Sequence, residues 1–234
     1  MNKLHTLILM CLLSLVGISA NALVFHSCNA NHDGKVDDPY NGHEYVDLGL
    51  SVKWATCNVG AVSPEDYGDY FAWGETEPKD FYAWSTYKWC NGSYDTLTKY
   101  CTDSKYGTVD NKTVLDLEDD AAHVNWGGDW RMPTKAEQDE LYNNCTWEWT
   151  TQNGVNGYKV TSKINGNSIF LPAAGYGGYG GYGGVLGQGG YGYYWSSTPN
   201  GRCIAYYLFF NSGYQFVDYS GRLNGYSVRA VLAE

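Results

Sequence analysis

The feature that most constrains this chain is a pair of aromatic strands near its C-terminus. The first strand is predicted over Ala205–Phe210, the turn over Asn211–Gly213 and the second strand over Tyr214–Tyr219. Alternate side chains of a strand point to opposite faces, so one face carries Tyr207, Phe209, Tyr214, Phe216 and Asp218. The other face carries Tyr206, Leu208, Phe210, Gln215, Val217 and Tyr219. Because both faces are apolar, one needs a core and the other needs more protein or a partner. We expect the face with Tyr207 to be a binding surface.

Composition narrows the class of protein. The chain has 234 residues, 44% of them hydrophobic and 17% charged, which suits one compact domain after processing. The 29 glycines and 22 tyrosines beside only 6 prolines predict many short strands and turns rather than long helices. A formal charge of -10 argues against nucleic-acid binding and against electrostatic docking on anionic lipid.

The N-terminus has the pattern of an export signal, in which a basic start precedes an apolar run. Two endings compete. Residues 1–22 end in Ala20-Asn-Ala22, an ordinary cleavage site, whereas residues 1–27 end at a loose lipobox, Phe25-His-Ser-Cys28, with Cys28 as the lipidated residue. We favour the lipoprotein. Residues 28–43 then form a polar, acidic tether, and the domain spans residues 44–234. The expected location is the outer membrane and cell surface, or otherwise the secreted fraction.

Export permits disulfides. Cys90 and Cys101 enclose a short polar loop and are candidates for a disulfide, and Cys57 with Cys145 is a second pairing that the sequence does not decide. The cysteine and histidine spacings fit no zinc pattern. We therefore expect no metal site and no cofactor.

Several elements of the middle of the chain are predicted from local patterns. Strand-like alternation runs through residues 44–61 around Gly49, and Tyr70–Gly74 is a short apolar strand. Residues 75–113 show no helical periodicity, and we expect aromatic and aliphatic side chains to pin them to the core, namely Trp84, Tyr87, Trp89 and Leu97.

A helix and a hairpin follow this irregular stretch. Thr134-Lys-Ala-Glu137 is a capping box that starts a helix ending near Asn143. Strands are expected over Thr146–Thr151, Gly157–Ile164 and Ser168–Pro172, with the Asn165–Asn167 turn making a hairpin of the last two. Residues 173–184 are too rich in glycine to hold a strand, so we expect a loop that carries Tyr176, Tyr179 and Tyr182.

A run of carboxylates, Asp116, Glu118, Asp119 and Asp120, admits two interpretations. One is a catalytic or metal site. The other, which we favour, is helix capping and charge pairing beside Arg131.

Five separated segments together resemble a known family. They are Glu44–Gly60, Trp73-Gly-Glu-Thr76, Gly128–Glu137, Leu171-Pro-Ala-Ala-Gly175 and Gly192-Tyr-Tyr-Trp-Ser-Ser197. The segments occur in the same order as similar segments of the Fibrobacter succinogenes major paralogous domain, which is found in exported proteins of Bacteroides relatives. The resemblance covers nearly all of residues 44–231. It implies an α+β, C-type-lectin-like fold related to the formylglycine-generating enzymes, with short strands, few helices and long loops.

The C-terminus resembles a narrower group, the variable proteins of Bacteroides-type diversity-generating retroelements. There, template adenines are randomised, so that Asn codons become NNY codons. The resemblance implies a variable region of about residues 201–226, interleaved with and followed by a fixed frame that includes Ala205, Tyr206, Leu208, Phe210, Val217, Arg222, Val228 and Arg229. The replaceable positions, which we expect to contact ligand, are Cys203, Ile204, Tyr207, Phe209, Tyr214, Phe216, Asp218, Tyr219, Ser220, Gly221, Leu223 and Tyr226. Tyr226 fits the Asn-codon pattern less well than the others.

The leading hypothesis is a surface-displayed binding protein whose Tyr- and Phe-rich patch recognises a protein or glycan on another cell, a phage or a host surface. A lectin-like fold does not by itself imply sugar binding. The alternatives are a structural or fimbrial-tip surface protein and, less favoured, an enzyme related to the formylglycine-generating enzymes. No catalytic residue is assigned, because no suitable cysteine pair or Ser-His-Asp set can be assembled from the sequence.

Overall fold

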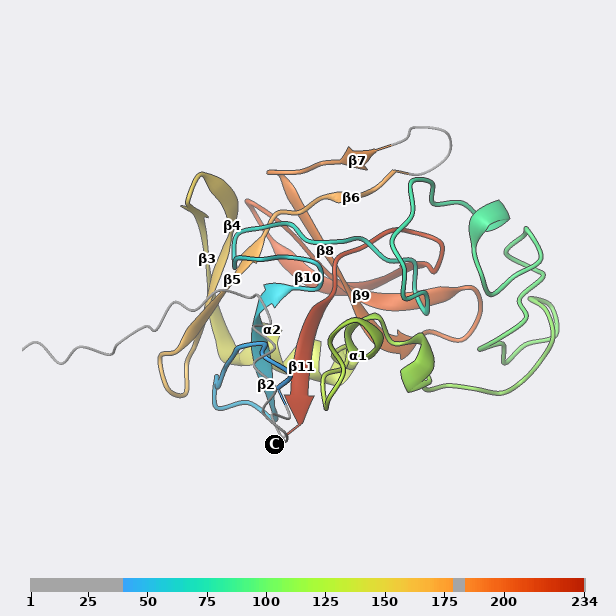
Figure 1. The fold of residues 1–234 in the computed structure, drawn as a ribbon, viewed down its shortest axis with the longest axis horizontal. Coiled ribbons are helices and arrows are strands. Elements are labelled where there is room, and N and C mark those ends of the chain that lie inside the picture. The colour runs from blue at the N-terminus through green and yellow to red at the C-terminus, as the bar shows by residue number, and fades with distance from the viewer. Residues whose placement is uncertain (1–39, 179–183, 234) are drawn as a thin grey trace, which may run out of the picture.

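The computed structural model describes residues 40–178 and 184–233. These residues form mostly antiparallel sheet with few helices, 39% strand and 12% helix, as Figure 1 shows. This confirms the predicted α+β class with short strands. The signal segment, Cys28, Tyr179 and Tyr182 lie outside the described residues. None of the helices in the described ranges is long and apolar enough to cross a membrane.

The first sheet joins the two ends of the domain. Its order is β1-β2-β11, with β1 at Tyr45–Val46, β2 at Val52–Asn58 and β11 at Arg229–Ala233. The predicted alternation is confirmed at Leu48, Leu50, Val52 and Trp54, which are all buried, although a turn over residues 47–51 separates the two strands. The C-terminal strand is therefore held beside the first long strand of the domain.

The second sheet and the helix before it follow the sequence prediction closely. The capping box at Thr134 and Glu137 starts α2, Lys135–Asn144. The sheet order is β3-β4-β5, with strands Cys145–Gln152, Val155–Ser162 and Ser168–Pro172. These signals act between residues close in sequence, so the local chain suffices to set them.

The third sheet contains the predicted aromatic strand pair. Its order is β10-β9-β8, with β8 at Tyr191–Pro199, β9 at Ile204–Asn211 and β10 at Gln215–Gly221. One face of this sheet packs into a core that includes Leu208 and Phe210. Helix α2 contributes Leu141 to that core, and its Gln138 side chain donates to the carbonyl of Tyr194 at 3.0 Å.

The segment of residues 75–113 forms a lobe of largely irregular chain at the right of Figure 1. Its only regular element is a 3-10 turn at Trp84–Thr86. Tyr87 and Leu97 are buried there, and Trp84 and Trp89 pack partly against them, so the predicted anchoring is confirmed. The predicted strand at Tyr70–Gly74 is wrong, because the segment forms a single bridge between Phe71 and Tyr226.

The expected disulfide between Cys90 and Cys101 is not formed. Both are free thiols, and their sulfur atoms donate to the carbonyls of Trp84 at 3.1 Å and Asp103 at 3.2 Å. The loop is closed instead by its backbone, because Cys90 bridges Leu97 and the amide of Thr98 donates to the carbonyl of Trp89 at 2.9 Å. Cys145 is also free, so the pairing of Cys57 with Cys145 is wrong, although Cys57 is disulfide-bonded.

Two more short helical elements lie between the irregular lobe and α2. A 3-10 turn at Leu117–Asp119 leads into α1, Ala121–Trp126. The Asp120 carboxylate caps α1 by accepting from the amides of Ala122 and His123, and it also accepts from Met132 at 2.9 Å. Asp120 thereby ties α1 to the segment that enters α2.

The domain begins earlier than the boundary at Glu44 that the sequence suggested. Tyr40 packs against the core, and its carbonyl accepts from the indole of Trp130 at 2.7 Å. The His43 ring stacks on Trp126 at 3.9 Å between centroids. The chain from Tyr40 onward is therefore part of the packed domain rather than of a tether.

The segments that suggested the family meet around β8. The indole of Trp195 donates to the carbonyl of Phe71 at 2.8 Å, and the indole of Trp73 donates to Ser196 at 2.9 Å. The Tyr194 hydroxyl donates to Pro172 at 2.7 Å. All these groups are buried and paired, as buried polar groups must be, so the motifs build the scaffold that holds the third sheet.

Candidate ligand-binding site

Aromatic rings cover the face of the third sheet that is turned away from α2. We call this the aromatic face, and it consists of Tyr191, Tyr193, Tyr207, Phe209, Tyr214 and Phe216. Each strand supplies rings at every second position, because side chains on one face have a period of two. Cross-strand neighbours pair Tyr193 with Phe209 and Phe209 with Phe216. The rings of both pairs are 5.0 Å apart between centroids.

The inner part of the aromatic face is buried, which corrects the expectation that it is presented whole to a partner. Tyr207 is 9% exposed and Phe209 is 7% exposed. Tyr207 lies against Trp195, Tyr193 and Tyr226. More protein therefore covers this part of the sheet, and these two rings support the rings above them.

The outer part of the aromatic face is open to solvent. Tyr214 is 55% exposed and Tyr191 is 44% exposed. Phe216 is half-buried, with Tyr214 stacked on it at 5.8 Å and 9° between ring planes. Exposed rings that rest on buried rings are rigid and lose little entropy on binding. This arrangement suits contact with another molecule.

Polar groups border the rings at the other end of β10. The Asp218 carboxylate is exposed and forms no ion pair within the described residues. The Asn224 amide donates to the Ser220 hydroxyl at 2.8 Å, and the Tyr226 hydroxyl lies 3.2 Å from that same oxygen. Hydrogen-bonding groups therefore flank an apolar centre, as in many recognition surfaces.

Two phenols of the aromatic face, those of Tyr193 and Tyr207, have a raised pKa. Burial raises the pKa of Tyr193 to about 12, with further contributions from Tyr176, Tyr191 and Tyr214. Burial, followed by the negative charge of Asp218, raises the pKa of Tyr207 to about 12 as well. These hydroxyl groups therefore act as neutral hydrogen-bonding groups rather than as acids or bases.

The other predicted ligand-contacting residues lie elsewhere. Tyr219 is 53% exposed but is on the α2 side of the sheet, edge-on to Tyr206. Ile204 pairs with Gly221 at the far end of the β9–β10 ladder. Cys203 and the buried Leu223 pack into the core of the irregular lobe. The structure thus groups part of the predicted set on one surface and disperses the rest.

The predicted frame is mostly buried. Arg222 is fully buried, and its guanidinium donates to the carbonyls of Tyr100 at 3.0 Å and Ile204 at 3.2 Å. Arg229 donates to Asn58 and to three backbone carbonyls. Burial lowers the pKa of Arg229 to about 10. These arginines cross-link the segments beneath the sheet.

Two exposed or half-buried rings of the site were missed by sequence reasoning, and a third, Tyr176, was expected only as part of a loop. Tyr191 and Tyr193 belong to β8, and the alternation Tyr191, Tyr193, Trp195 was the signal that would have placed them. Tyr176 lies in β6, Tyr176–Gly177, which pairs with β7, Val185–Leu186. The ring of Tyr176 contacts Tyr193 at 5.2 Å. The glycine-rich segment was predicted to be a loop, and these two-residue strands correct that.

Tyr82 holds two glycine segments close together beside the site. The amide of Gly177 donates to the carbonyl of Gly225 at 2.7 Å, and the Tyr82 ring covers both residues. A Cβ atom at Gly225 would lie 2.5 Å from that ring, and one at Gly177 would lie closer still. The Tyr82 hydroxyl donates to Tyr70 at 2.5 Å. Only glycine leaves room for this ring at both positions.

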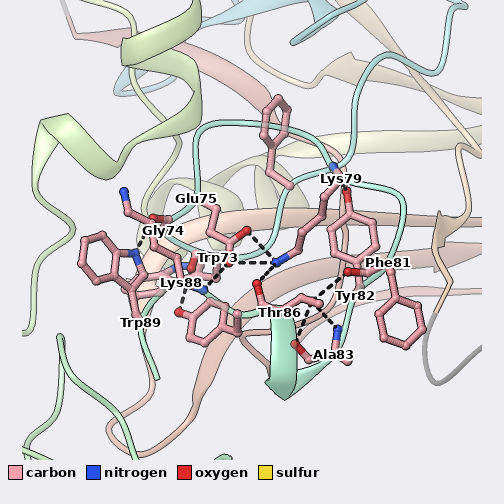
Figure 2. Close-up of polar contacts among 12 residues, drawn as sticks. Trp73, Gly74, Glu75, Lys79, Phe81, Tyr82, Ala83, Thr86, Lys88 and Trp89 are labelled. Atoms are coloured by element: carbon pink, nitrogen blue, oxygen red, sulfur yellow. Dashed lines mark hydrogen bonds and ion pairs between the residues drawn. The ribbon is translucent and has the colours of Figure 1, made fainter. Parts of the chain in front are cut away.

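The loop that carries Tyr82 is fixed by a buried carboxylate. Figure 2 shows the Lys79 ammonium between the Glu75 carboxylate, at 2.7 Å, and the Thr86 carbonyl, at 2.9 Å. Glu75 also accepts from the amide of Lys88 at 2.7 Å, and the Trp89 indole donates to Gly74 at 2.6 Å. The Trp73-Gly-Glu motif therefore stabilises a loop.

The carboxylate cluster is neutralised by lysines. Asp116, Glu118 and Asp119 each place an oxygen near the Lys99 ammonium, at 2.7, 3.2 and 2.5 Å. Lys112 pairs with Asp116 as well. Because ammonium groups already lie among these carboxylates, the cluster stabilises the lobe through ion pairs. This agrees with the charge pairing that we favoured over a catalytic or metal site. Arg131 pairs instead with Glu137 at 2.6 Å.

Comparisons with known proteins do not add to this description, since no family model, curated protein or solved structure matches the chain.

Proposed function

We propose that the chain is a surface-displayed binding protein whose C-terminal region recognises a variable partner through the aromatic face. The observation that carries this proposal is the stack of rings that leads from the buried Phe209 through Phe216 to the exposed Tyr214. A monomeric domain has no structural need for exposed rings on a sheet whose core is already formed on both sides. Such rings are characteristic of recognition surfaces.

The division between frame and replaceable positions supports diversification of this surface. Frame residues Ala205, Leu208, Phe210 and Val228 are at most 1% exposed, so their replacement would disturb the core. Tyr214, Phe216, Asp218 and Ser220 are exposed or half-buried, and changes there cost little stability. Tyr207, Phe209, Leu223 and Tyr226 are replaceable on the codon pattern yet buried. We propose that substitutions at these buried positions change the orientation of the exposed rings that pack on them.

The scaffold fits the C-type-lectin-like fold that the sequence resemblance implies. The paired ends of the domain, the small antiparallel sheets and the irregular lobe beside the third sheet are the features that support this assignment. On this proposal the fold is a frame for the aromatic face, and no catalytic role is assigned to it.

Variation among strains tests the proposal. Sequencing the last forty or so codons in sibling strains should show substitutions concentrated at the replaceable positions, with the buried frame unchanged. A reverse-transcriptase gene and a near-copy of the coding segment for residues 201–231 should lie beside this gene. Variation spread evenly over the domain, or a neighbourhood without both elements, would contradict diversification.

Display on the cell surface through a lipid at Cys28 is part of the same proposal. Metabolic labelling with a clickable fatty acid should mark the protein, and Cys28→Ala should abolish the label and release the protein from the membrane fraction. A labelled Cys28→Ala variant, or a wild-type protein that is never labelled, would favour simple secretion.

A further inference from the structure

The two edges of the third sheet differ. The outer edge of β8 is covered, because Gly192 bridges Gly175 and Tyr194 bridges Ser227. The amide of Ser227 donates to Tyr193 and the amide of Trp195 donates to Ser227, both at 3.0 Å. Strand β10, in contrast, pairs with β9 alone, and within the described residues no other segment bridges to it.

Two hydrogen bonds show which backbone groups of β10 point outward. The amide of Asn211 donates to Tyr214, and the amide of Arg222 donates to Cys203, both at 3.0 Å. In an antiparallel ladder, hydrogen-bonded pairs alternate with non-bonded pairs. The backbone groups of Phe216, Asp218 and Ser220 therefore point toward β9, and those of the residues between them, Gln215, Val217, Tyr219 and Gly221, point away from the sheet.

Part of this outward edge is already occupied. The amide of Tyr219 donates to its neighbour Asp218 at 2.9 Å, and the carbonyl of Gly221 accepts from Asn224 at 3.1 Å. The amides and carbonyls of Gln215 and Val217 and the carbonyl of Tyr219 have no hydrogen-bond partner among the residues that the structure describes. Such groups form a template for one more strand.

We infer that the β10 edge accepts an extended segment of a protein partner as an added strand. This inference rests on the proposed function and names the partner's form. Main-chain hydrogen bonds would supply affinity, and side chains at alternate positions would supply specificity. Gln215 and Val217, whose backbone groups are free, are not replaceable positions. Every variant of the C-terminal region would therefore keep this edge while Tyr214, Phe216 and Asp218 beside it change.

Two observations favour a polypeptide partner of a different kind from this chain. The backbone amides and carbonyls without a partner recur at every second residue of β10, about 7 Å apart. An extended polypeptide has donors and acceptors that alternate with this same repeat. Two copies of the chain, each with a net charge of -10, repel one another. Pairing of β10 with itself would also bring the two exposed Asp218 carboxylates toward one another.

The test uses proline to remove a single outward amide. Val217→Pro deletes the amide that points away from β9, which an edge strand tolerates, and Val217→Ala removes the same side chain but keeps the amide. The probe is a set of short linear peptides selected from a phage-displayed random library on the immobilised wild-type domain. Calorimetry should show that Val217→Pro weakens their binding by about tenfold or more, whereas Val217→Ala changes it little.

A second measurement does not depend on the proline variant being folded. On adding a selected peptide to the wild-type domain, the amides of Gln215 and Val217 should become protected from hydrogen exchange in NMR spectra. Absence of this protection, equal binding by Val217→Pro and Val217→Ala, or failure of the library to yield any binding peptide would each overturn the inference.

The outcomes separate this inference from the proposed function. If Tyr214→Ser and Phe216→Ser abolish binding of the selected peptides but Val217→Pro does not, the aromatic face binds and the edge does not. If none of the three changes binding, both proposals fail. A concentration-dependent dimer in sedimentation that Val217→Pro dissociates would mean that a second copy occupies the edge, which would overturn the inference of a foreign partner.

Discussion

The ring of Tyr214 lies parallel to the ring of Phe216, with 9° between the ring planes. Phe216 in turn packs against Phe209, with 5.0 Å between the ring centroids. Phe209 is buried, and its ring also contacts the rings of Tyr191 and Tyr193. The three rings connect solvent to the core across two strands. The exposed ring of this stack is therefore available for binding, whereas the buried ring is needed for folding.

Substitution along this stack should separate stability from binding. Tyr214→Ser removes an exposed ring and should change the free energy of unfolding by at most about 0.5 kcal/mol. Phe209→Ala leaves a cavity under the stack and should cost about 3–5 kcal/mol. Urea unfolding followed by tryptophan fluorescence measures both. Equal midpoints for Phe209→Ala and wild type would show that the face is not packed as described.

The contact of Tyr82 with two glycine segments predicts a coupled pair of substitutions. A Cβ at Gly225 meets the Tyr82 ring, so Gly225→Ala should destabilise the domain by about 1–3 kcal/mol. Gly190→Ala is the matched control, because the nearest heavy atom to its Cβ is at 3.7 Å. In a Tyr82→Ala background, Gly225→Ala should cost much less, since the clash is gone. An additive double mutant would contradict this contact.

Local patterns sufficed for much of the fold. The capping box at Thr134, the turn at Asn165 and the alternation along Ala205–Phe210 each depend on residues close in sequence, and each element formed where it was predicted. The strand at Tyr70–Gly74 failed because bridge formation depends on a distant partner, Tyr226, which contacts this segment at one position only.

The alternation of side chains along the strands could not predict which rings of the aromatic face are exposed. Period two places Tyr207 and Phe209 on the same face as Tyr214, but it does not say what covers each ring. Tyr193 and Tyr226 cover Tyr207 and come from segments on either side of the strand pair in sequence. The thiol pairing failed for a similar reason, since two cysteines flanking a loop need not approach each other in space.

The lysine-bound carboxylates predict a specific dependence of stability on pH. Hydrogen bonds from Lys112 and then Lys99 lower the pKa of Asp116 from 3.8 to about 2. Because the folded-state pKa lies below the unfolded-state value, the stabilisation is fully present above pH 3.8 and is lost as the pH falls toward 2.

Asp116→Asn should therefore reduce stability near neutral pH, and the difference from wild type should shrink as the pH falls through this window. Urea unfolding at a series of pH values measures the difference, and solvent screening keeps it small. Asp95→Asn, at an exposed position in the same lobe, is the control. A difference that stays constant down to pH 2 would mean that Asp116 stabilises the lobe by some means other than its charge.

Thiol labelling tests which cysteines are free and which is disulfide-bonded. Cys90, Cys101, Cys145 and Cys203 are free, and burial raises the pKa of the Cys145 thiol to about 11. In denaturant without reductant, iodoacetamide should label all four, whereas Cys57 should be labelled only after reduction. Reduction-dependent labelling of Cys90 and Cys101 would restore the disulfide that the sequence suggested.

The same experiment bears on the anchor of the protein. A non-reducing digest identifies the peptide that is linked to Cys57, and mass spectrometry reads its sequence. A cysteine whose sulfur carries a thioether-linked lipid has no thiol left to form a disulfide. A peptide containing Cys28 joined to Cys57 would therefore exclude lipidation of those molecules, and the protein would then be displayed by other means or secreted. A lipid on Cys28 requires that Cys57 be joined to something else.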